Sequence, residues 1–353
     1  MTYNPFQRGT HTVGTRSFDW TDDQRERTLP VDIWYPTTRV FSGQDLTKAT
    51  QDHYSVMPGM PEVTQSAVRD ADAEQGSWPL IIFSHGFGGE RRQSTFLYTH
   101  LASHGYVVAA MDHVGNTTMD MLAGDSTPND MSVLGQFIDD RPKDCSFVID
   151  RMLSGKAGLN IVPEKIGISG HSFGGWTSLM TANSDGRIKA ALLLAPAGGR
   201  SSEDQEGISA MSDSLELNWR QPVEVLTLVA ELDSLLPLEG MLDLHNRTQR
   251  PRMTIMLKNA DHFHFCDRVE AAHDGFKLIM LSMAEDEQME ADLEKMKDAE
   301  DLCPGEQANT FTRGLGLAHF DAHLSGNPRA AEWLHGDLVA LLARQGADIE
   351  VFD

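Results

Sequence analysis

One stretch of the sequence, Lys165-Ile-Gly-Ile-Ser-Gly-His-Ser-Phe-Gly-Gly-Trp176, carries the residue types of a nucleophilic site. Its apolar run from Ile166 to Ser169 predicts a strand, and a helical pattern follows the glycines. Between them, Ser172 stands in a G-x-S-x-G elbow, a strained turn that makes a serine hydroxyl project above a sheet. Gly170 and Gly174 remove the side chains that would collide there. The pattern predicts a catalytic serine, with a plain glycine-rich turn as the alternative.

A second glycine-rich turn, His85-Gly-Phe-Gly-Gly89, follows the apolar run Leu80 to Phe83. Acyl transfer needs N–H donors aimed at the oxyanion of the tetrahedral intermediate. One donor comes from the residue after the nucleophile, here Phe173, and the other comes from an H-G-x-G loop. We interpret Phe87 as the second donor, and an ordinary glycine turn is the alternative.

Two residues that fit a serine nucleophile follow later predicted strands. Asp233 comes after the strand 222–230, and His262 comes after the strand 253–258. The chain order Ser, Asp, His is the order found in α/β-hydrolases. A parallel sheet gathers the carboxyl ends of its strands at one edge. We therefore expect His262 to accept the proton of Ser172 and Asp233 to orient the imidazole.

Both assignments have alternatives. His264 could be the base, because two residues on an extended segment point the same way. His262 is preferred because it comes sooner after the break at Asn259-Ala260. Asp233 could instead cap a helix before Leu235. A metal pair of His262 and His264 is the weaker interpretation, because further ligands are missing, and we expect no metal and no other cofactor.

Side chains near these motifs are candidates for lining a substrate pocket. They are His85, Gly86, His113, Asn116, His171, Trp176 and His264. His113 and Asn116 follow the predicted strand 106–111, at the edge where ligands of an open α/β sheet bind. A hydrogen-bonded loop histidine is an equally good interpretation of His113.

Strand and helix patterns alternate from about residue 80 to 265. This alternation predicts a mostly parallel, doubly wound sheet with helices on both faces. The proline-flanked run 28–36 predicts a strand at the sheet edge, and 253–258 is expected to be the last strand. Pro142 is expected to open one helix, and Pro328 the final one.

We expect one domain, residues 1–353, with surface or lid insertions at residues 37–77, 114–138, 198–219 and 266–312. The acidic stretch 280–301 has apolar residues at helical spacing, which predicts an amphipathic helix. An ordinary surface helix is preferred there over a mobile lid.

The composition limits the partners. The net charge of −23 disfavours binding to nucleic acid or to an anionic membrane surface. The three cysteines are scattered, as in a reduced cytoplasmic protein without disulfides. The first residues lack an apolar signal core, and no run of about 18 apolar residues is present, so neither secretion nor stable membrane insertion is expected.

The sequence resembles the bacterial α/β-hydrolases related to platelet-activating-factor acetylhydrolase and dienelactone hydrolase. The segments that carry the resemblance are 29–36, 84–89, 101–113, 141–144, 170–175 and those that hold Asp233 and His262. It implies a metal-free serine ester hydrolase whose oxyanion donors are Phe87 and Phe173. Dienelactone hydrolases use a cysteine nucleophile, and Ser172 departs from that pattern.

We therefore expect a carboxylesterase that cleaves small esters of short or medium acyl chains through an acyl-enzyme. Alternatives are a phospholipid acetyl ester hydrolase, a polyester or lactone hydrolase, an amidase and a thioesterase. From another class, the chain could be an inactive binding protein on a hydrolase scaffold. The sequence does not indicate an oligomeric state.

Overall fold

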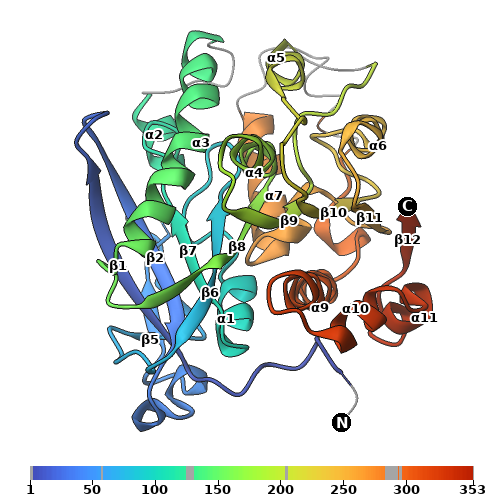
Figure 1. Cartoon of the computed structure of the whole chain (residues 1–353). Coiled ribbons are helices and arrows are strands. Elements are labelled where there is room, and N and C mark those ends of the chain that lie inside the picture. The colour runs from blue at the N-terminus through green and yellow to red at the C-terminus, as the bar shows by residue number, and fades with distance from the viewer. Residues whose placement is uncertain are drawn as a thin grey trace.

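A ten-stranded sheet runs through the molecule (Figure 1). The computed structural model describes residues 3–56, 59–124, 131–202, 206–282, 293 and 296–352. The strand order is β12-β11-β10-β9-β8-β6-β7-β2-β1-β5. The strands are β1 (Val13–Asp22), β2 (Arg27–Pro36), β5 (Val68–Arg69), β6 (Ser77–Ser84), β7 (Val107–Met111), β8 (Asn160–His171), β9 (Ile188–Leu194), β10 (Glu224–Ala230), β11 (Arg252–Leu257) and β12 (Ile349–Phe352).

The centre of the sheet is parallel. Strands β6 to β11 pair in parallel, whereas β1, β2 and β12 join in antiparallel pairs near the two edges. The predicted mostly parallel α/β sheet is therefore confirmed. Its register aligns the functional segments, because Ser84 of β6 lies beside Gly170 of β8, and His171 lies beside Leu194 of β9.

Helices cover both faces of the sheet. In β8, Gly170 packs against α4, whereas Gly167, three residues earlier, packs against Phe320 of α9. Because strand side chains alternate between faces, α4 and α9 lie on opposite sides. The helices are α1 (Thr95–Ser103), α2 (Thr118–Ala123), α3 (Met131–Leu153), α4 (Phe173–Ser184), α5 (Glu206–Ser214), α6 (Leu238–Arg247), α7 (Val269–Ser282), α9 (Gly305–His323), α10 (Pro328–Leu334) and α11 (Leu338–Ala343).

Shorter elements complete the described chain. Two strands, β3 (Asp52–Tyr54) and β4 (Val63–Gln65), form a separate antiparallel pair within the predicted insertion 37–77. The 3-10 turns are η1 (Arg39–Phe41), η2 (Gln44–Leu46), η3 (His262–Phe265) and η4 (Ala299–Asp301). The single-domain arrangement stays a prediction.

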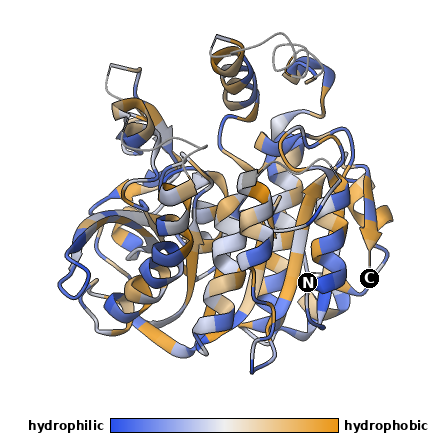
Figure 2. Ribbon diagram, turned by 90° about the horizontal axis from the view of Figure 1, so that it is seen from above, coloured by the Kyte–Doolittle hydropathy of each residue, from blue (hydrophilic) through white to orange (hydrophobic). Residues whose placement is uncertain are grey.

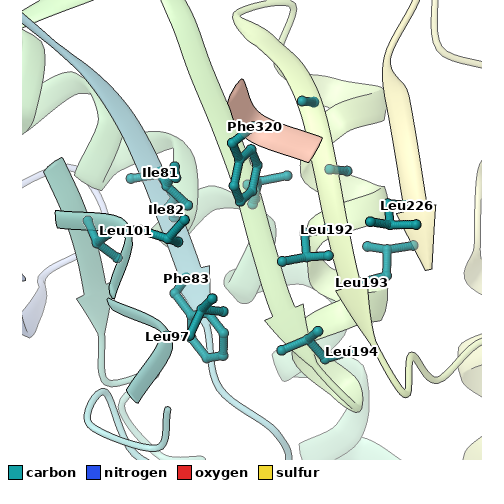
Figure 3. Close-up of a cluster of buried hydrophobic side chains, with 14 of the residues drawn as sticks. Ile81, Ile82, Phe83, Leu97, Leu101, Leu192, Leu193, Leu194, Leu226 and Phe320 are labelled. Atoms are coloured by element: carbon teal, nitrogen blue, oxygen red, sulfur yellow. The ribbon is translucent and has the colours of Figure 1, made fainter. Parts of the chain in front are cut away.

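The core lies where the central strands meet helices on each face. Figure 3 shows the side chains of β6 and β9 packed with Leu97 and Leu101 of α1 and with Phe320 of α9. Residues 80–84 of β6 and every residue of β9 except Lys189 are buried, as expected for parallel strands covered on both faces. Figure 2 shows the same distribution, with hydrophobic colour along the strands and hydrophilic colour on much of the helices and loops.

Two strand predictions are wrong. Strand β2 is not at an edge, because β1 pairs with it over its whole length and β7 lies on its other side. The carbonyl of Pro30 still accepts a hydrogen bond from Asp112 N at 2.9 Å, so this proline serves the sheet as an acceptor. Strand β11 is not the last, because the short β12 pairs with it from the end of the chain.

Two helix predictions are also wrong. Pro142 does not open its helix but lies inside α3, which begins at Met131. A proline removes one helical hydrogen bond, and the helix persists because residues on both sides of Pro142, such as Phe137 and Cys145, are buried in the core. The final helix is two helices, because α10 ends before His335-Gly336 and α11 begins afterwards.

Most of the stretch 283–295 lies outside the described residues, so the amphipathic helix predicted over 280–301 is not assessed there. The helices of the described ranges include none with the length and apolarity needed to cross a membrane.

Leu192→Ala should lower the free energy of unfolding by about 2–5 kcal/mol, because truncating a buried leucine leaves a cavity. Leu192 is fully buried in β9, and its side chain reaches the backbone of α9 at Gly316. Urea denaturation followed by circular dichroism measures the change. The control is Val339→Ala, which is 50% exposed and should cost less than about 0.5 kcal/mol. Equal effects of the two substitutions would contradict this location of the core.

Candidate active site

Ser172 stands at the tight turn between β8 and α4. Its backbone angles are φ 56° and ψ −120°, in a region that non-glycine residues rarely adopt. Side chains at Gly170 and Gly174 would overlap the carbonyl oxygens of Gly174 and Ser84, respectively. The Ser172 N–H donates to Leu194 O at 2.9 Å, which ties the turn to β9. Close packing on both sides therefore holds the strained conformation that the G-x-S-x-G pattern predicts.

Asp233 and His262 form a buried pair after β10 and β11. The distance from Asp233 Oδ2 to His262 Nδ1 is 2.8 Å, and their side chains are 0% and 3% exposed. Asp233 Oδ1 also accepts hydrogen bonds from the N–H groups of Leu235 and Leu236, at 3.0 and 2.7 Å. Asp233 does not cap a helix, because α6 begins only at Leu238, and its Oδ1 instead holds the turn at Leu235 and Leu236 while Oδ2 pairs with His262.

The pairing changes the acidity of His262. Burial alone would lower its pKa, but the charge of Asp233 and the hydrogen bond to it, together with the charge of Asp261, raise the pKa above the ordinary histidine value. Asp261 also joins the two loops, because its Oδ1 accepts from the N–H groups of His262 and Ser234. The imidazole is thus held by Nδ1 in a fixed orientation that leaves Nε2 for proton transfer.

The H-G-x-G loop lies directly over the serine. A side chain placed at Gly86 would come within 3.5 Å of Ser172 Cβ. The rings of Phe87 and Phe173 are neighbours, with centroids 6.2 Å apart. Among the described residues, the backbone N–H groups of Phe87 and Phe173 have no hydrogen-bond acceptor. Both predicted oxyanion donors are therefore available near the serine.

His171 connects the serine turn to the histidine loop. Its ring lies 4.5 Å from that of His262, and its Nε2 donates to the His262 carbonyl oxygen at 3.0 Å. Within the described part of the chain, no hydrogen bond joins the Ser172 hydroxyl to His262. Such bonds are often long in free enzymes and tighten when substrate binds. The structure thus places Ser172 and His262 at the same edge of the sheet, and His171, the residue before Ser172, contacts His262 directly.

His264 does not share the direction of His262. The two residues lie in the 3-10 turn η3, not on an extended segment, so their rings diverge. His264 Nδ1 accepts from Asp261 N, and Nε2 donates to the Cys303 carbonyl oxygen, each at 3.0 Å. Both nitrogens are occupied by backbone groups, so the metal-pair interpretation loses its second ligand. Among the described residues, no group of three or more His, Cys, Asp or Glu could hold a metal ion.

The structure corrects the prediction of pocket-lining residues. His85, His113, Asn116, Trp176 and His264 are at most 1% exposed. Each is used inside the protein: His85 Nε2 accepts from His113 N at 3.0 Å, and Trp176 Nε1 donates to Met211 O at 2.8 Å. Gly86 and His171 are buried too, but they lie against Ser172 and His262 and form the inner wall of the site.

His113 belongs to a buried polar network that the sequence analysis did not assemble. Its Nδ1 lies 2.9 Å from Asp144 Oδ2, and its Nε2 lies 2.9 Å from Ser84 Oγ. The fully buried Arg141 donates to Ser84 Oγ at 3.1 Å and also to the carbonyl oxygen of His85. The sequence pointed to this network only through the segment 141–144, which is one of the segments that carry the family resemblance. No role was assigned to its residues.

Gln93 was missed altogether. Its side chain bonds to the H-G-x-G loop and to His171, and no sequence pattern marks it.

Comparisons with known proteins agree with this geometry. A family model described as "Serine aminopeptidase, S33" matches residues 77–281, which is more than half of the chain. The chain belongs to this hydrolase family. A second model, described as "Platelet-activating factor acetylhydrolase, isoform II", matches residues 2–123.

Relatives of this family member include esterases. The platelet-activating factor acetylhydrolase of Bos taurus is 27% identical in an alignment of 246 residues that covers 54% of each chain. Cutinase est1 of Thermobifida alba is 26% identical in an alignment of 197 residues that covers 54% of this chain and 55% of the cutinase. The chain thus spans about half the length of the curated relatives it matches, and the predicted resemblance to the acetylhydrolase group is confirmed.

A solved structure supports the α/β-hydrolase fold. The ferulic acid esterase from Streptomyces cinnamoneus superposes with a TM-score of 0.63 at 24% identity, covering 91% of this chain and 93% of that one. At this identity the likeness establishes the fold alone.

Asp233→Asn should lower the pKa of His262 below the ordinary histidine value. The substitution removes the charge that raises this pKa and leaves the burial that lowers it. NMR titration of the imidazole in both proteins measures the shift, with the exposed His53 as an internal reference. An unchanged His262 pKa would mean that the pair is not charged in solution.

Proposed function

We propose that the chain is a serine carboxylic-ester hydrolase that works through an acyl-enzyme. The observation that carries the proposal is the buried Asp233–His262 pair, 2.8 Å apart, at the sheet edge where Ser172 occupies its strained turn. The backbone N–H groups of Phe87 and Phe173, which have no acceptor among the described residues, belong to the two turns that meet at Ser172. These are a nucleophile, an oriented base and oxyanion donors, the parts that acyl transfer requires.

The mechanism follows from which atoms are free. His262 Nε2 accepts the Ser172 proton while Oγ attacks the ester carbonyl, and Asp233 stabilises the resulting imidazolium. The N–H groups of Phe87 and Phe173 donate to the oxyanion. When the intermediate collapses, His262 gives its proton to the leaving alcohol. Water then attacks the acyl-enzyme with His262 as the base, which releases the acid and restores Ser172.

Short acyl esters are the favoured substrate class. A small hollow beside the elbow is lined mostly by apolar residues, including Pro196, Ile208, Leu236 and Met241. Pro196, one of its lining residues, precedes Ala197, whose N–H donates to Ser172 O at 3.0 Å. The names of several relatives, which are acetylhydrolases, support an acetyl or similarly short acyl group. A larger cavity of about 340 Å³ lies at the amino ends of β6 and β8, at the opposite end of the strands from Ser172.

A second candidate is hydrolysis of an acetyl ester on a phospholipid. It is favoured by the names of several relatives, which are platelet-activating factor acetylhydrolases. The description of the family names an aminopeptidase instead, and amide cleavage would use the same residues. The absence of a cofactor and the cytoplasmic location inferred from the scattered cysteines stay predictions.

Ser172→Ala should abolish hydrolysis of p-nitrophenyl acetate, because loss of a triad nucleophile costs on the order of a million-fold in turnover. A panel of p-nitrophenyl esters of increasing acyl length should show the highest kcat/KM for the shortest chains, and aminoacyl p-nitroanilides should be poor substrates. A spectrophotometric assay of the released p-nitrophenolate and p-nitroaniline measures both. More than a few per cent of activity in the variant, with contamination excluded, would rule out the serine mechanism.

His262→Ala should approach the loss caused by Ser172→Ala, because nucleophile and base act as one unit. His264→Ala should reduce turnover by about tenfold or less, because His264 bonds only to backbone groups outside the proton path. It should instead lower the thermal midpoint, since it leaves two buried backbone partners unsatisfied. Steady-state kinetics and thermal melts of both variants separate the roles. The reverse ranking in turnover would move the base to His264.

A further inference from the structure

The side chain of Gln93 bonds to three segments of the candidate active site. Its Oε1 accepts from the N–H of Gly86 at 2.9 Å, in the loop that carries Phe87. Its Nε2 donates to His171 Nδ1 at 2.6 Å, in the residue before the nucleophile. The same Nε2 lies 3.1 Å from Cys266 Sγ, in the segment after the histidine turn. One amide thus joins the oxyanion loop, the elbow and the histidine loop.

The chemistry of the partners fixes the direction of each bond. A backbone N–H can only donate, so the atom of Gln93 that meets Gly86 N is the carbonyl oxygen. The amide nitrogen must then donate to His171 Nδ1, which leaves the proton of that ring on Nε2. His171 Nε2 in turn donates to the carbonyl oxygen of His262. The chain of donors therefore runs from Gln93 through His171 to the backbone of the base.

His171 can accept a hydrogen bond from Gln93 and donate one to the His262 carbonyl oxygen because its imidazole is neutral. Burial and the nearby charge of His262 lower its pKa well below the ordinary value. A neutral imidazole has one donor and one acceptor, which is what the two bonds require. Glutamine likewise has a donor and an acceptor on one carbon, whereas a carboxylate has acceptors alone.

Gln93 itself is held firmly by its backbone. Its carbonyl oxygen accepts from Asp267 N at 2.8 Å, and its own N–H donates to Glu90 O at 3.1 Å. The next residue, Ser94, donates through Oγ to Phe265 O at 3.0 Å. The side chain also fills the space beside Gly89, where a Cβ would come within 2.5 Å of Gln93 Oε1. The amide is therefore presented from a fixed position under the loop.

We propose that Gln93 is a positioning residue that fixes the oxyanion loop against the nucleophile turn. By holding the N–H of Gly86, it fixes the His85–Gly86 peptide, which adjoins the peptide that carries the Phe87 N–H. The Phe87 N–H itself has no acceptor among the described residues. Through its hydrogen bond to His171, Gln93 also fixes the position of the nucleophile turn relative to His262. This inference rests on the proposed ester hydrolysis, since it concerns the alignment of the same oxyanion donors.

The test replaces Gln93 with methionine, which has a similar length but no hydrogen-bonding amide. Removal of one oxyanion donor costs about 10²–10³ in kcat, and misalignment of a donor that is still present should cost less. We expect Gln93→Met to lower kcat for p-nitrophenyl acetate by about tenfold to a hundredfold, with KM changed less than about twofold. The rate at which a fluorophosphonate probe labels Ser172, followed by intact mass, should fall by a similar factor.

The matched control is Gln221→Met. Gln221 is also half-buried, but it lies before β10, and within the described ranges its side chain makes one hydrogen bond, to Asp185 O at 3.4 Å. This variant should keep the kinetics of the wild type. A Gln93→Met protein with kcat within twofold of the wild type, or with its loss confined to KM, would overturn the positioning role. A wild type that neither hydrolyses the ester nor labels at Ser172 would overturn the proposed function, and this inference with it.

A second variant, Gln93→Glu, keeps the proposal testable if the methionine variant does not fold. An ionised carboxylate can accept from Gly86 N but cannot donate to His171. One additional proton shared between the carboxylate and His171 restores both bonds. The kcat of Gln93→Glu divided by that of the wild type should therefore be highest at about pH 5 and fall toward about pH 8. This interval includes the pH at which a carboxyl group or an imidazole ordinarily loses its proton. A flat ratio at the wild-type level would contradict the proposed donor role.

Discussion

The structure depends on the crowding around Ser172. Its φ of 56° persists because Gly170 and Gly174 let β8, α4 and the end of β6 approach until only glycine fits. Strained residues persist when the surrounding structure over-determines them. The hydrogen bond from Ser172 N to Leu194 O fixes the turn from the other side. The direction of the hydroxyl, the reach of the oxyanion loop and the place of His171 all follow from this packing.

The polar interior around the turn is arranged by charge. The protein carries a net charge of −23, yet the group buried under the oxyanion loop is the cation Arg141. Burial lowers its pKa to about 9, and its guanidinium lies 4.4 Å from the Phe173 ring. It donates to the His85 carbonyl from one side of the loop, while Gln93 accepts from Gly86 on the other. The carbonyl oxygen and the N–H of the His85–Gly86 peptide are thus held by two different side chains, which limits the motion of the loop.

The comparisons and the geometry contribute different information. Likeness to a solved esterase at 24% identity reflects the conserved packing of sheet and helices. A shared fold does not establish a reaction, because one scaffold supports many chemistries. What distinguishes this chain is the set of side chains at the carboxyl edge of its sheet. The buried pair of Asp233 and His262, which leaves His262 Nε2 without a partner among the described residues, is the feature that favours hydrolysis over a merely binding role.

The sequence by itself determined the parallel core and the triad candidates, because buried strands and glycine turns depend on local patterns. It placed Ser172, Asp233 and His262 after strands, and parallel pairing brought these segments to one edge. Tertiary structure decided the strands at the edges, the continuation of α3 through Pro142 and the different partners of His262 and His264. It also assembled Gln93 and Arg141 around the loop. These outcomes rest on contacts between residues far apart in the chain, which no local pattern encodes.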